Sequence, residues 1–213
     1  MLCSNCGGEA KPIWASDIDG TLSDYHDTFS HYCWKYWGVT HVIGYEPWDG
    51  TGEFEDYLQV TKAQYREAKL AFRQGGNKRW ARIYPGAREL AEAVHGAGGE
   101  FWVATTRPWQ RLDNIDPDTR WWLDHQGIKV DGLLYGDHKY DLLTEAVDQD
   151  RIVGVLDDLP EQYRHAESLG LPAYLRINDH NVTAPLTMRR INLHQAAEIA
   201  HGLILEWRFT HAH

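Results

Sequence analysis

Cysteine is scarce in this chain, and long apolar runs are missing. The 213 residues include 3 cysteines, an odd number that does not suit the paired disulfides of a small secreted protein. No apolar run reaches the roughly 18 residues that a membrane-spanning helix needs, so we expect no membrane segment. The N-terminus lacks the basic start and apolar stretch of a signal peptide. Together these absences predict a cytoplasmic protein.

Positive charge is also in short supply, except in one segment. The chain has 31 acidic residues against 21 lysines and arginines, a net charge of −10 that argues against a general affinity for nucleic acid. Residues 62–82 reverse this balance with seven basic residues and a single acid, for a net charge of +6. The basic residues are Lys62, Arg66, Lys69, Arg73, Lys78, Arg79 and Arg82. Such a run favours either an anion-binding surface or a solvated helix face, and the sequence leaves both open.

From Tyr84 onward, short apolar runs alternate with helical patterns. This alternation is typical of a parallel sheet whose strands are joined by crossover helices. The predicted strands cover residues 13–16, 100–105, 132–135, 152–156 and 173–176. The predicted helices cover residues 87–95, 119–126, 141–147, 161–169 and 193–207. The sequence therefore predicts an α/β fold with a parallel sheet of about five strands flanked by helices.

Residues 24–83 do not show this alternation of strand and helix patterns. Residues 27–37 have a helical, aromatic pattern, and residues 44–52 resemble a loop. Thr61 and Gln64 form a capping box that opens a helix running to about Arg73. An insertion directly after the first strand lies above the carboxyl edge of the sheet and can cover a site there. The predicted parts are an N-terminal segment (1–8), a core (9–23 and 84–213) and a helical cap (24–83).

Two acids stand where the first predicted strand ends. Asp17 and Asp19 follow the apolar run and precede Gly20 and Thr21, at the sheet edge where open α/β folds assemble their sites. Two neighbouring carboxylates repel each other unless a cation or a shared proton relieves them. Mg²⁺ favours carboxylate oxygens and substrate phosphates, and it is the cation that we expect. One carboxylate can then attack phosphorus while the other handles a proton.

Polar residues follow three further predicted strands. Thr105 ends one strand, and Lys139 stands at the start of a helix after another. Asp157 and Asp158 end a third strand. Because the strands of a parallel sheet end at the same edge, we expect these side chains to converge on Asp17. Acids that bind Mg²⁺ and donors that bind phosphate oxygens suit metal-assisted phosphoryl transfer.

The order of these motifs resembles the haloacid dehalogenase superfamily of phosphohydrolases. Its first motif, Asp-x-Asp-Gly-Thr, is matched by residues 17–21, and its second, a Thr or Ser after an apolar strand, by Thr105. The third motif, a lysine, is matched by Lys139, and the fourth, paired acids after a strand, by residues 157–158. The resemblance covers about residues 12–176 and implies a Rossmann-like core with the cap inserted after the first strand.

The resemblance implies a role for each matched residue. Asp17 would form an aspartyl-phosphate, Asp19 would serve as general acid and then as base, and Lys139 would complete the catalytic group. Mg²⁺ would be held by Asp17, by the backbone carbonyl of Asp19 and by an acid of the fourth motif. Asp158 is the first choice for that acid, with Asp157 beside it. Substrate contacts are expected from Gly20, Tyr25, Thr105, Thr106 and Arg107.

Two branches of this superfamily look close. Asp24, Tyr25 and the run 105–108 resemble the 5'(3')-deoxyribonucleotidases, in which Tyr25 would face the base and Thr106 would help to bind phosphate. Residues 139–141 resemble the 3'-phosphatase domain of polynucleotide kinase/phosphatases, whose nucleic-acid 3' end would suit the basic cap segment. The kinase motif Gly-x4-Gly-Lys-Ser/Thr does not occur. The sequence leaves open whether Tyr25 is a core residue and whether Arg107 is a surface arginine.

These patterns predict an enzyme, a Mg²⁺-dependent phosphomonoesterase of the haloacid dehalogenase superfamily. Its expected substrate is a phosphorylated small molecule, with a nucleotide as first choice and a polynucleotide 3' end as the alternative. A phosphate-binding or regulatory module that kept the fold without turnover is the alternative from another class. No key position of the four motifs is replaced, which favours the enzyme.

Cys3 and Cys6 form half of a zinc knuckle. Cys33, or His211 with His213, would complete a Zn²⁺ site if the chain ends meet. A lone Cys-x-x-Cys is also compatible with two free thiols, and the sequence leaves both open.

Overall fold

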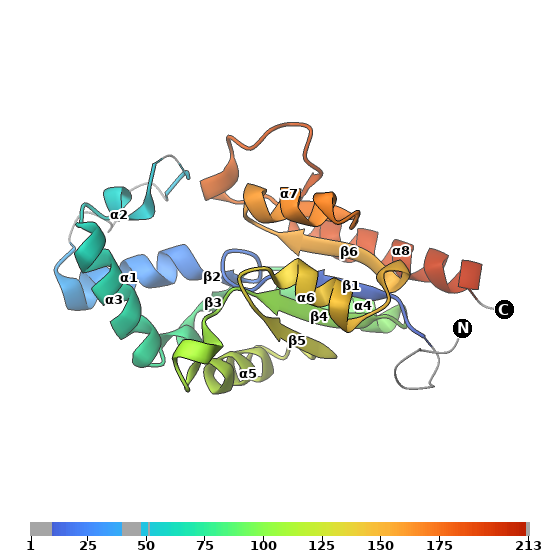
Figure 1. Ribbon diagram of the computed structural model, residues 1–213, viewed down its shortest axis with the longest axis horizontal. Coiled ribbons are helices and arrows are strands. Elements are labelled where there is room, and N and C mark those ends of the chain that lie inside the picture. Colours follow the sequence, from blue (N-terminus) through green and yellow to red (C-terminus); the bar gives the residue numbers. More distant parts are fainter. Residues whose placement is uncertain (1–9, 40–47, 51, 212–213) are drawn as a thin grey trace.

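The computed structural model describes residues 10–39, 48–50 and 52–211, and a parallel sheet forms its centre (Figure 1). The strand order is β5-β4-β1-β6-β7-β8, and every neighbouring pair is parallel. The strands are β1 Ile13–Ser16, β4 Glu100–Thr105, β5 Gly132–Tyr135, β6 Ile152–Asp157, β7 Ala173–Arg176 and β8 Arg190–Ile191. The predicted α/β fold is confirmed.

The five predicted strands of the parallel sheet all occur, and one described strand of that sheet, β8, was missed. Four have the predicted bounds, and β6 extends one residue further, to Asp157. The sequence does not predict β8, because two residues at the edge of a sheet are too few to show an alternating pattern.

Four helices, α4 to α7, precede strands of the sheet along the chain, and α8 follows the last strand. They are α4 Ala87–Gly96, α5 Ile115–His125, α6 Lys139–Ala146, α7 Pro160–Ser168 and α8 Leu193–His211. Short 3-10 helices are η2 Trp109–Arg111, η3 Gln149–Arg151 and η4 Asp179–Asn181. Helix α5 begins four residues earlier than predicted and includes Pro117 in its first turn. A proline is tolerated there because the N–H groups of the first turn have no helical hydrogen-bond acceptor to lose.

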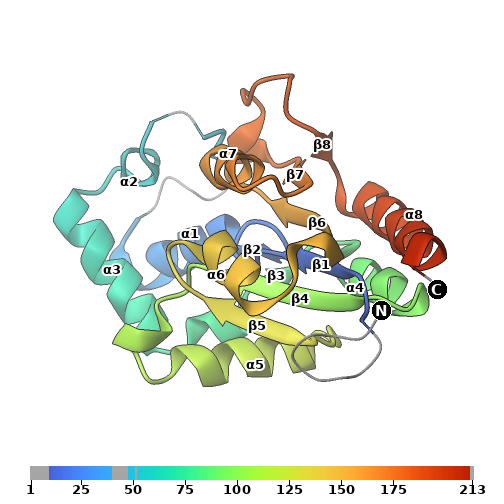
Figure 2. The ribbon, with the colours of Figure 1, turned by 45° about the vertical axis from the view of Figure 1, so that its right-hand side comes forward.

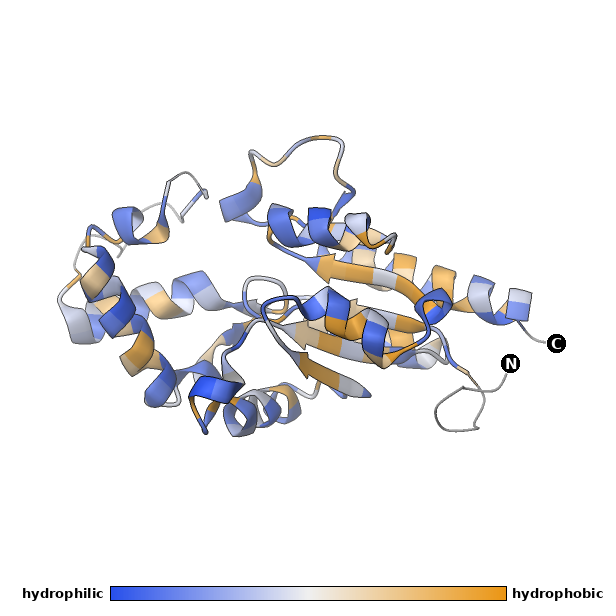
Figure 3. Ribbon diagram, in the orientation of Figure 1, coloured by the Kyte–Doolittle hydropathy of each residue, from blue (hydrophilic) through white to orange (hydrophobic). Residues whose placement is uncertain are grey.

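Alternate residues of the central strand β1 point to opposite faces of the sheet. Trp14 belongs to an apolar cluster with residues of α4, α5 and α8, whereas Ile13 and Ala15 belong to another with residues of α6 and α7. Figure 2 shows the strands between these helical layers, and Figure 3 shows apolar colour concentrated in the strands. Helices therefore cover both faces, which leaves the carboxyl edge as the open side of the sheet.

The inserted segment leaves and rejoins the sheet through two paired strands. Strand β2, Ser23–Asp24, lies antiparallel to β3, Arg82–Ile83. Between them are α1 Tyr25–Trp37, α2 Phe54–Tyr57, α3 Lys62–Gln74 and the 3-10 helix η1 Asn77–Trp80. The capping box of Thr61 and Gln64 is present as predicted. We keep the name cap for residues 24–83, which have an apolar cluster of their own around Phe29 and Phe72.

The predicted zinc ligands do not come together in the described part of the chain. Cys33 is buried in the apolar cluster of the cap, and His211 stacks on Trp207 at the end of α8. Helix α1 and the end of α8 lie at opposite ends of the molecule (Figure 1). Cys3, Cys6 and His213 fall outside the described residues. Among the described helices, none is long and apolar enough to cross a membrane.

Candidate active site

The carboxyl ends of β1 and β6 meet at Lys139, the first residue of α6. Lys139 Nζ lies 2.7 Å from Asp17 Oδ1 and 2.6 Å from Asp157 Oδ2. The hydroxyl of Tyr140 donates a 2.6 Å hydrogen bond to the same oxygen of Asp157. All four side chains are buried. The structure therefore joins in one buried group three residues that the sequence placed at three separate strand ends.

Burial dominates the protonation chemistry of this group. Burial raises the pKa of Asp17 to about 7; the Lys139 ammonium opposes the rise, and the carboxylates of Asp157 and Asp158 add to it. Burial also raises the pKa of Asp157 against the pull of Lys139. Although burial alone would lower it, the Asp157 and Asp17 carboxylates raise the pKa of Lys139. Lys139 is therefore a fixed ammonium that faces more negative charge than it can neutralise.

Asp158 is held by two loops. Its Oδ1 accepts a 2.8 Å hydrogen bond from Thr21 Oγ1, and its Oδ2 lies 2.6 Å from His180 Nε2. Gly20 has a φ of +93°, and a Cβ at this position would collide with the Asp158 carboxylate. Only glycine allows the backbone to pass this close to the acid. Although burial would raise it, the hydrogen bond from His180 lowers the pKa of Asp158.

Asp19 has a separate set of partners. Its carboxylate pairs with Lys78 of η1 and accepts hydrogen bonds from Arg107, at 2.6 Å from Nη2 and 3.2 Å from Nε. Arg107 also donates a 3.0 Å hydrogen bond to Thr119 Oγ1, which fixes its guanidinium. Although burial alone would raise it, Arg107 and Lys78 hold the pKa of Asp19 far below its usual range. Asp17 and Asp19 are therefore shifted in opposite directions.

A cavity of about 630 Å³, the main cavity, lies between these acids and the cap. Its core side includes Asp19 and Asp158, and its cap side includes aromatic rings and basic residues. The basic residues are Lys62, Arg66, Lys69, Arg73 and Lys78. Five of the seven basic residues of the 62–82 segment thus face one cavity beside the acids, which favours the anion-binding interpretation of the segment over a purely solvated helix face.

The predicted substrate residues lie in different settings around the main cavity. Thr106 is exposed and lines it, whereas Thr105 is buried at the end of β4. Arg107 is fully buried and contacts Asp19 without lining the main cavity. Tyr25 lines the cavity, but its ring stacks on Phe29 with the ring centroids 5.8 Å apart. Tyr25 is therefore mainly a core residue of the cap, and Arg107 is a buried partner of Asp19 and not a surface arginine.

The buried acids suit a hard divalent cation. Asp17, Asp157 and Asp158 set three buried carboxylates against one ammonium, and their repulsion contributes to the raised pKa of Asp17. Carboxylate and carbonyl oxygens are the ligands that Mg²⁺ prefers. Asp17, Asp158 and the backbone carbonyl of Asp19 would hold the ion. A bound Mg²⁺ would supply charge stabilisation for a phosphate oxygen.

Comparison with known proteins establishes the fold. No family model and no curated protein matches the sequence. A predicted phosphatase from Clostridium acetobutylicum has a similar structure, with a TM-score of 0.59, 15% identity, and coverage of 89% of this chain and 98% of that one. A hydrolase of the haloacid dehalogenase-like family from Streptococcus pneumoniae is also similar, with a TM-score of 0.53, 18% identity, and coverage of 89% and 97%. The chain has the haloacid dehalogenase-like fold.

A third neighbour is CbbY from Rhodobacter sphaeroides, solved in complex with phosphate. Its TM-score is 0.57 at 18% identity, with coverage of 87% of this chain and 96% of that one. The haloacid dehalogenase-like fold thus extends over nearly the whole of each neighbour. Identities this low establish the fold alone.

Two residues of the site were not singled out in the sequence. His180 contacts Asp158 from the loop after β7, four positions beyond the strand end, so the rule that polar residues gather at the carboxyl edge contained its signal. Lys78 belonged to the basic segment, but it pairs with an acid 59 positions away in the sequence. Nothing local distinguishes Lys78 from its basic neighbours.

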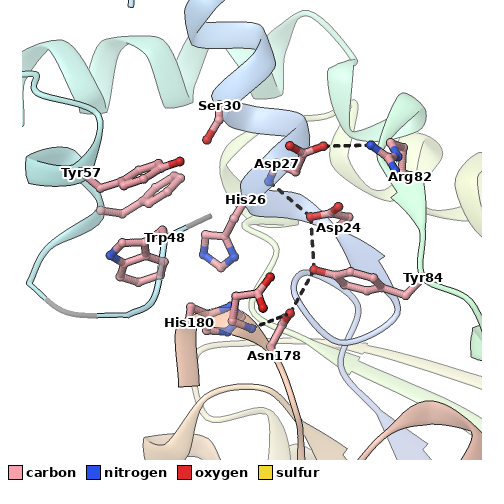
Figure 4. Close-up of a pocket in the computed structure, with 12 residues that line it drawn as sticks. Asp24, His26, Asp27, Ser30, Trp48, Tyr57, Arg82, Tyr84, Asn178 and His180 are labelled. Atoms are coloured by element: carbon pink, nitrogen blue, oxygen red, sulfur yellow. Dashed lines mark hydrogen bonds and ion pairs between the residues drawn. The ribbon is translucent and has the colours of Figure 1, made fainter. Parts of the chain in front are cut away.

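A second cavity, of about 310 Å³, is lined by His26 and His180 (Figure 4), and it shares His26 with the main cavity. The two imidazole rings have centroids 4.6 Å apart. Below them, Asn178 donates a 2.8 Å hydrogen bond to the carbonyl oxygen of Gly20, and its Oδ1 accepts from the hydroxyl of Tyr84. The wall of this cavity therefore connects the first helix of the cap to the two loops that hold Asp158.

We expect acid to destabilise the protein through His26. Burial, with His180 nearby, lowers the pKa of His26 from 6.5 to about 4. Between these values the unfolded chain binds more protons than the folded protein. The contribution of His26 to the free energy of unfolding is therefore fully present above pH 6.5. It falls by about 2 to 3 kcal/mol as the pH drops toward 4. Thermal unfolding midpoints across this range should fall less for His26→Gln than for the wild type, and parallel curves would contradict the prediction.

Proposed function

We propose that this protein is a Mg²⁺-dependent phosphomonoesterase that acts through an aspartyl-phosphate on Asp17. One observation supports it most. The buried Asp17 carboxylate is held by Lys139 and stands close to Asp157 and Asp158, and Asp158 and Asp19 line a cavity whose other side has basic residues. A nucleophile, an acid set for Mg²⁺ and cations for a phosphate thus adjoin one another, which is what phosphoryl transfer requires.

The proposed reaction has two displacements. An Asp17 oxygen attacks phosphorus, the ester P–O bond breaks, and the leaving oxygen takes a proton from Asp19. Water then attacks the same phosphorus and gives a proton to Asp19, and the bond between phosphorus and Asp17 breaks to release phosphate. Lys139 holds Asp17 in place and stabilises charge on the transferred group.

Asp19 must change its protonation state during this cycle. Its pairing with Arg107 and Lys78 keeps the carboxylate ionised in the described arrangement, which suits the base step. A bound phosphate that draws Lys78 away removes one stabilising cation from Asp19. The pKa of Asp19 then rises, and the carboxyl can carry the proton for the leaving group.

The substrate is proposed to be a phosphorylated small molecule that the cap selects. The main cavity is bounded by the cap and core and is of a size for a small ligand. Rings of Trp48, Phe54 and Tyr65 line it, which supports a nucleotide base or another flat group as part of the substrate. The CbbY neighbour holds phosphate, which supports the broader class of phosphate esters.

Metal removal tests the proposed function. Release of p-nitrophenol from p-nitrophenyl phosphate should fall at least about 100-fold when a chelator removes the metal, and should return when Mg²⁺ is added back. Asp158→Asn should raise the Mg²⁺ concentration for half-maximal rate. Asp124→Asn, a change to an exposed acid of α5, should leave it unaltered. Equal release with and without chelator would reject a metal-dependent enzyme.

A further inference from the structure

Three cations of the main cavity have no acidic partner among the described residues. Of the five that line it, Lys62 lies 3.8 Å from Glu55, and Lys78 pairs with Asp19. The remaining three are Arg66, Lys69 and Arg73. Lys69 Nζ donates a 3.1 Å hydrogen bond to the hydroxyl of Tyr65, a neutral group, and the carboxylates of Asp19 and Glu55 act on its charge without forming an ion pair.

Two of these cations are held partly out of water. The Nε atom of Arg73 is buried and has no hydrogen-bond partner in the described part of the chain. Burial and, to a smaller extent, the neighbouring Arg73 lower the pKa of Lys69 to about 8. An unpartnered buried donor beside a second cation is costly in the empty protein. A bound anion would relieve both the missing hydrogen bond and the repulsion.

The cations form one row. Arg66, Lys69 and Arg73 are spaced three and four residues apart along α3, so they share a face of the helix. Asp19 acts electrostatically on Lys69, which places this row within range of the acids. From Arg66 to Arg73 the row extends about 10 Å along the helix axis. The row lies on the cap side of the main cavity, whereas Asp19 and Asp158 lie on its core side, so it can bind a group separate from the one that reacts at Asp17.

We propose that the substrate carries a second anionic group, which Arg66, Lys69 and Arg73 bind while its phosphate monoester reacts at Asp17. This inference rests on the proposed function and narrows its substrate class. A second phosphate matches the three charges and the donor fork of a guanidinium better than a carboxylate does. The rings of Phe54 and Tyr65 line the same cavity and would pack against the organic part between the two anions. The expected substrate is therefore a small bisphosphate.

Substrate pairs that differ in one anion test this inference. The pairs are fructose 6-phosphate with fructose 1,6-bisphosphate, adenosine 5'-monophosphate with adenosine 3',5'-bisphosphate, and glycerol 3-phosphate with 3-phosphoglycerate. At least one bisphosphate should exceed its monophosphate about 10-fold or more in kcat/KM. A preference confined to 3-phosphoglycerate would overturn the phosphate assignment. Equal rates within all three pairs would overturn the second-anion site.

Substitutions in α3 test which residues cause the preference for a bisphosphate over a monophosphate. Arg73→Gln and, separately, Lys69→Gln should reduce the ratio of bisphosphate to monophosphate kcat/KM about 10-fold or more. Arg164→Gln, a change to an exposed residue of α7, is the matched control and should keep the wild-type ratio. Thermal unfolding of each variant shows that it is folded. Retention of the full ratio in both α3 variants would overturn the assignment of these residues.

Binding separates this inference from the proposed function. Calorimetric titration of the Asp17→Asn protein measures binding without turnover. The ligands are fructose 6-phosphate with fructose 1,6-bisphosphate, and adenosine 5'-monophosphate with adenosine 3',5'-bisphosphate. At least one bisphosphate should bind about 10-fold tighter than its monophosphate, and Arg73→Gln in the same background should remove the difference. If the wild type shows no metal-dependent release but this difference remains, the enzyme proposal fails and the anion site stands. Equal affinities within both pairs overturn the anion site even when the wild type is active.

Discussion

The Asp17→Asn variant is expected to lose at least about 10⁴-fold in kcat/KM for p-nitrophenyl phosphate. An amide oxygen is too weak a nucleophile to attack phosphorus, and a neutral side chain is a poorer ligand for Mg²⁺ than a carboxylate. Lys139 keeps its second partner, Asp157, so the variant should retain the local arrangement of α6 and β6. The assay is phosphate release with saturating Mg²⁺, with Asp124→Asn as the control.

Stability measurements show whether the lost activity of Asp17→Asn reflects the missing nucleophile or an unfolded protein. Asp17 has a pKa of about 7 in the folded, metal-free protein against about 3.8 when unfolded. The resulting stabilisation is complete below the unfolded pKa and is lost as the pH rises through 7. Asparagine does not titrate, so Asp17→Asn does not lose this stabilisation. As the pH rises from about 5 to 8, the thermal unfolding midpoint of the metal-free variant should therefore rise relative to that of the wild type. Full activity in a folded Asp17→Asn protein would reject the covalent mechanism and favour an adventitious phosphatase in the sample.

The meeting of Asp17, Lys139 and the acids after β6 could be predicted, because it depends on local signals and one topological rule. Each residue follows a short apolar run, and parallel strands end at the same edge. The strand bounds that carried the argument were nearly all correct, since buried parallel strands are continuous apolar runs. The roles of these residues in catalysis remain predictions that the experiments above test.

The partners of Asp19 and Asp158 could not be predicted in this way. Lys78 and His180 reach these acids across 59 and 22 positions of sequence, and such pairings depend on how the cap and the last loops pack. The sequence placed Arg107 beside Thr105 but contained no signal for its direction, which the hydrogen bonds to Asp19 and Thr119 determine. Side-chain direction at a loop is a tertiary property, so motif spacing does not encode it.

Lys139→Met is expected to cost both activity and stability. Methionine matches the length of lysine but removes the ammonium between Asp17 and Asp157, which leaves two buried carboxylates facing each other. The free energy of unfolding in urea at pH 8 should fall by about 3 to 5 kcal/mol, the usual cost of breaking a buried ion pair from one side. Phosphate release should fall at least about 10³-fold, because no fixed cation stabilises the transferred phosphoryl group.

The pH dependence of the Lys139→Met variant distinguishes lost charge from lost packing. Without the ammonium, the pKa values of Asp17 and Asp157 rise further, because burial already raises both. Carboxyl groups with raised folded pKa values stabilise the protein at low pH and lose that stabilisation as the pH rises. The destabilisation relative to wild type should therefore be smaller at pH 5 than at pH 8. A destabilisation independent of pH would assign the effect to packing.

A second substitution separates the two effects of Lys139. In Lys139→Met/Asp157→Asn, one of the two unpaired carboxylates is gone, so the double variant should recover about 1 to 3 kcal/mol of the lost stability. It should recover no activity, because the cation beside Asp17 is still missing. Recovery of phosphate release in the double variant would mean that Lys139 serves only to neutralise Asp157. The proposed role of its ammonium in phosphoryl transfer would then be wrong.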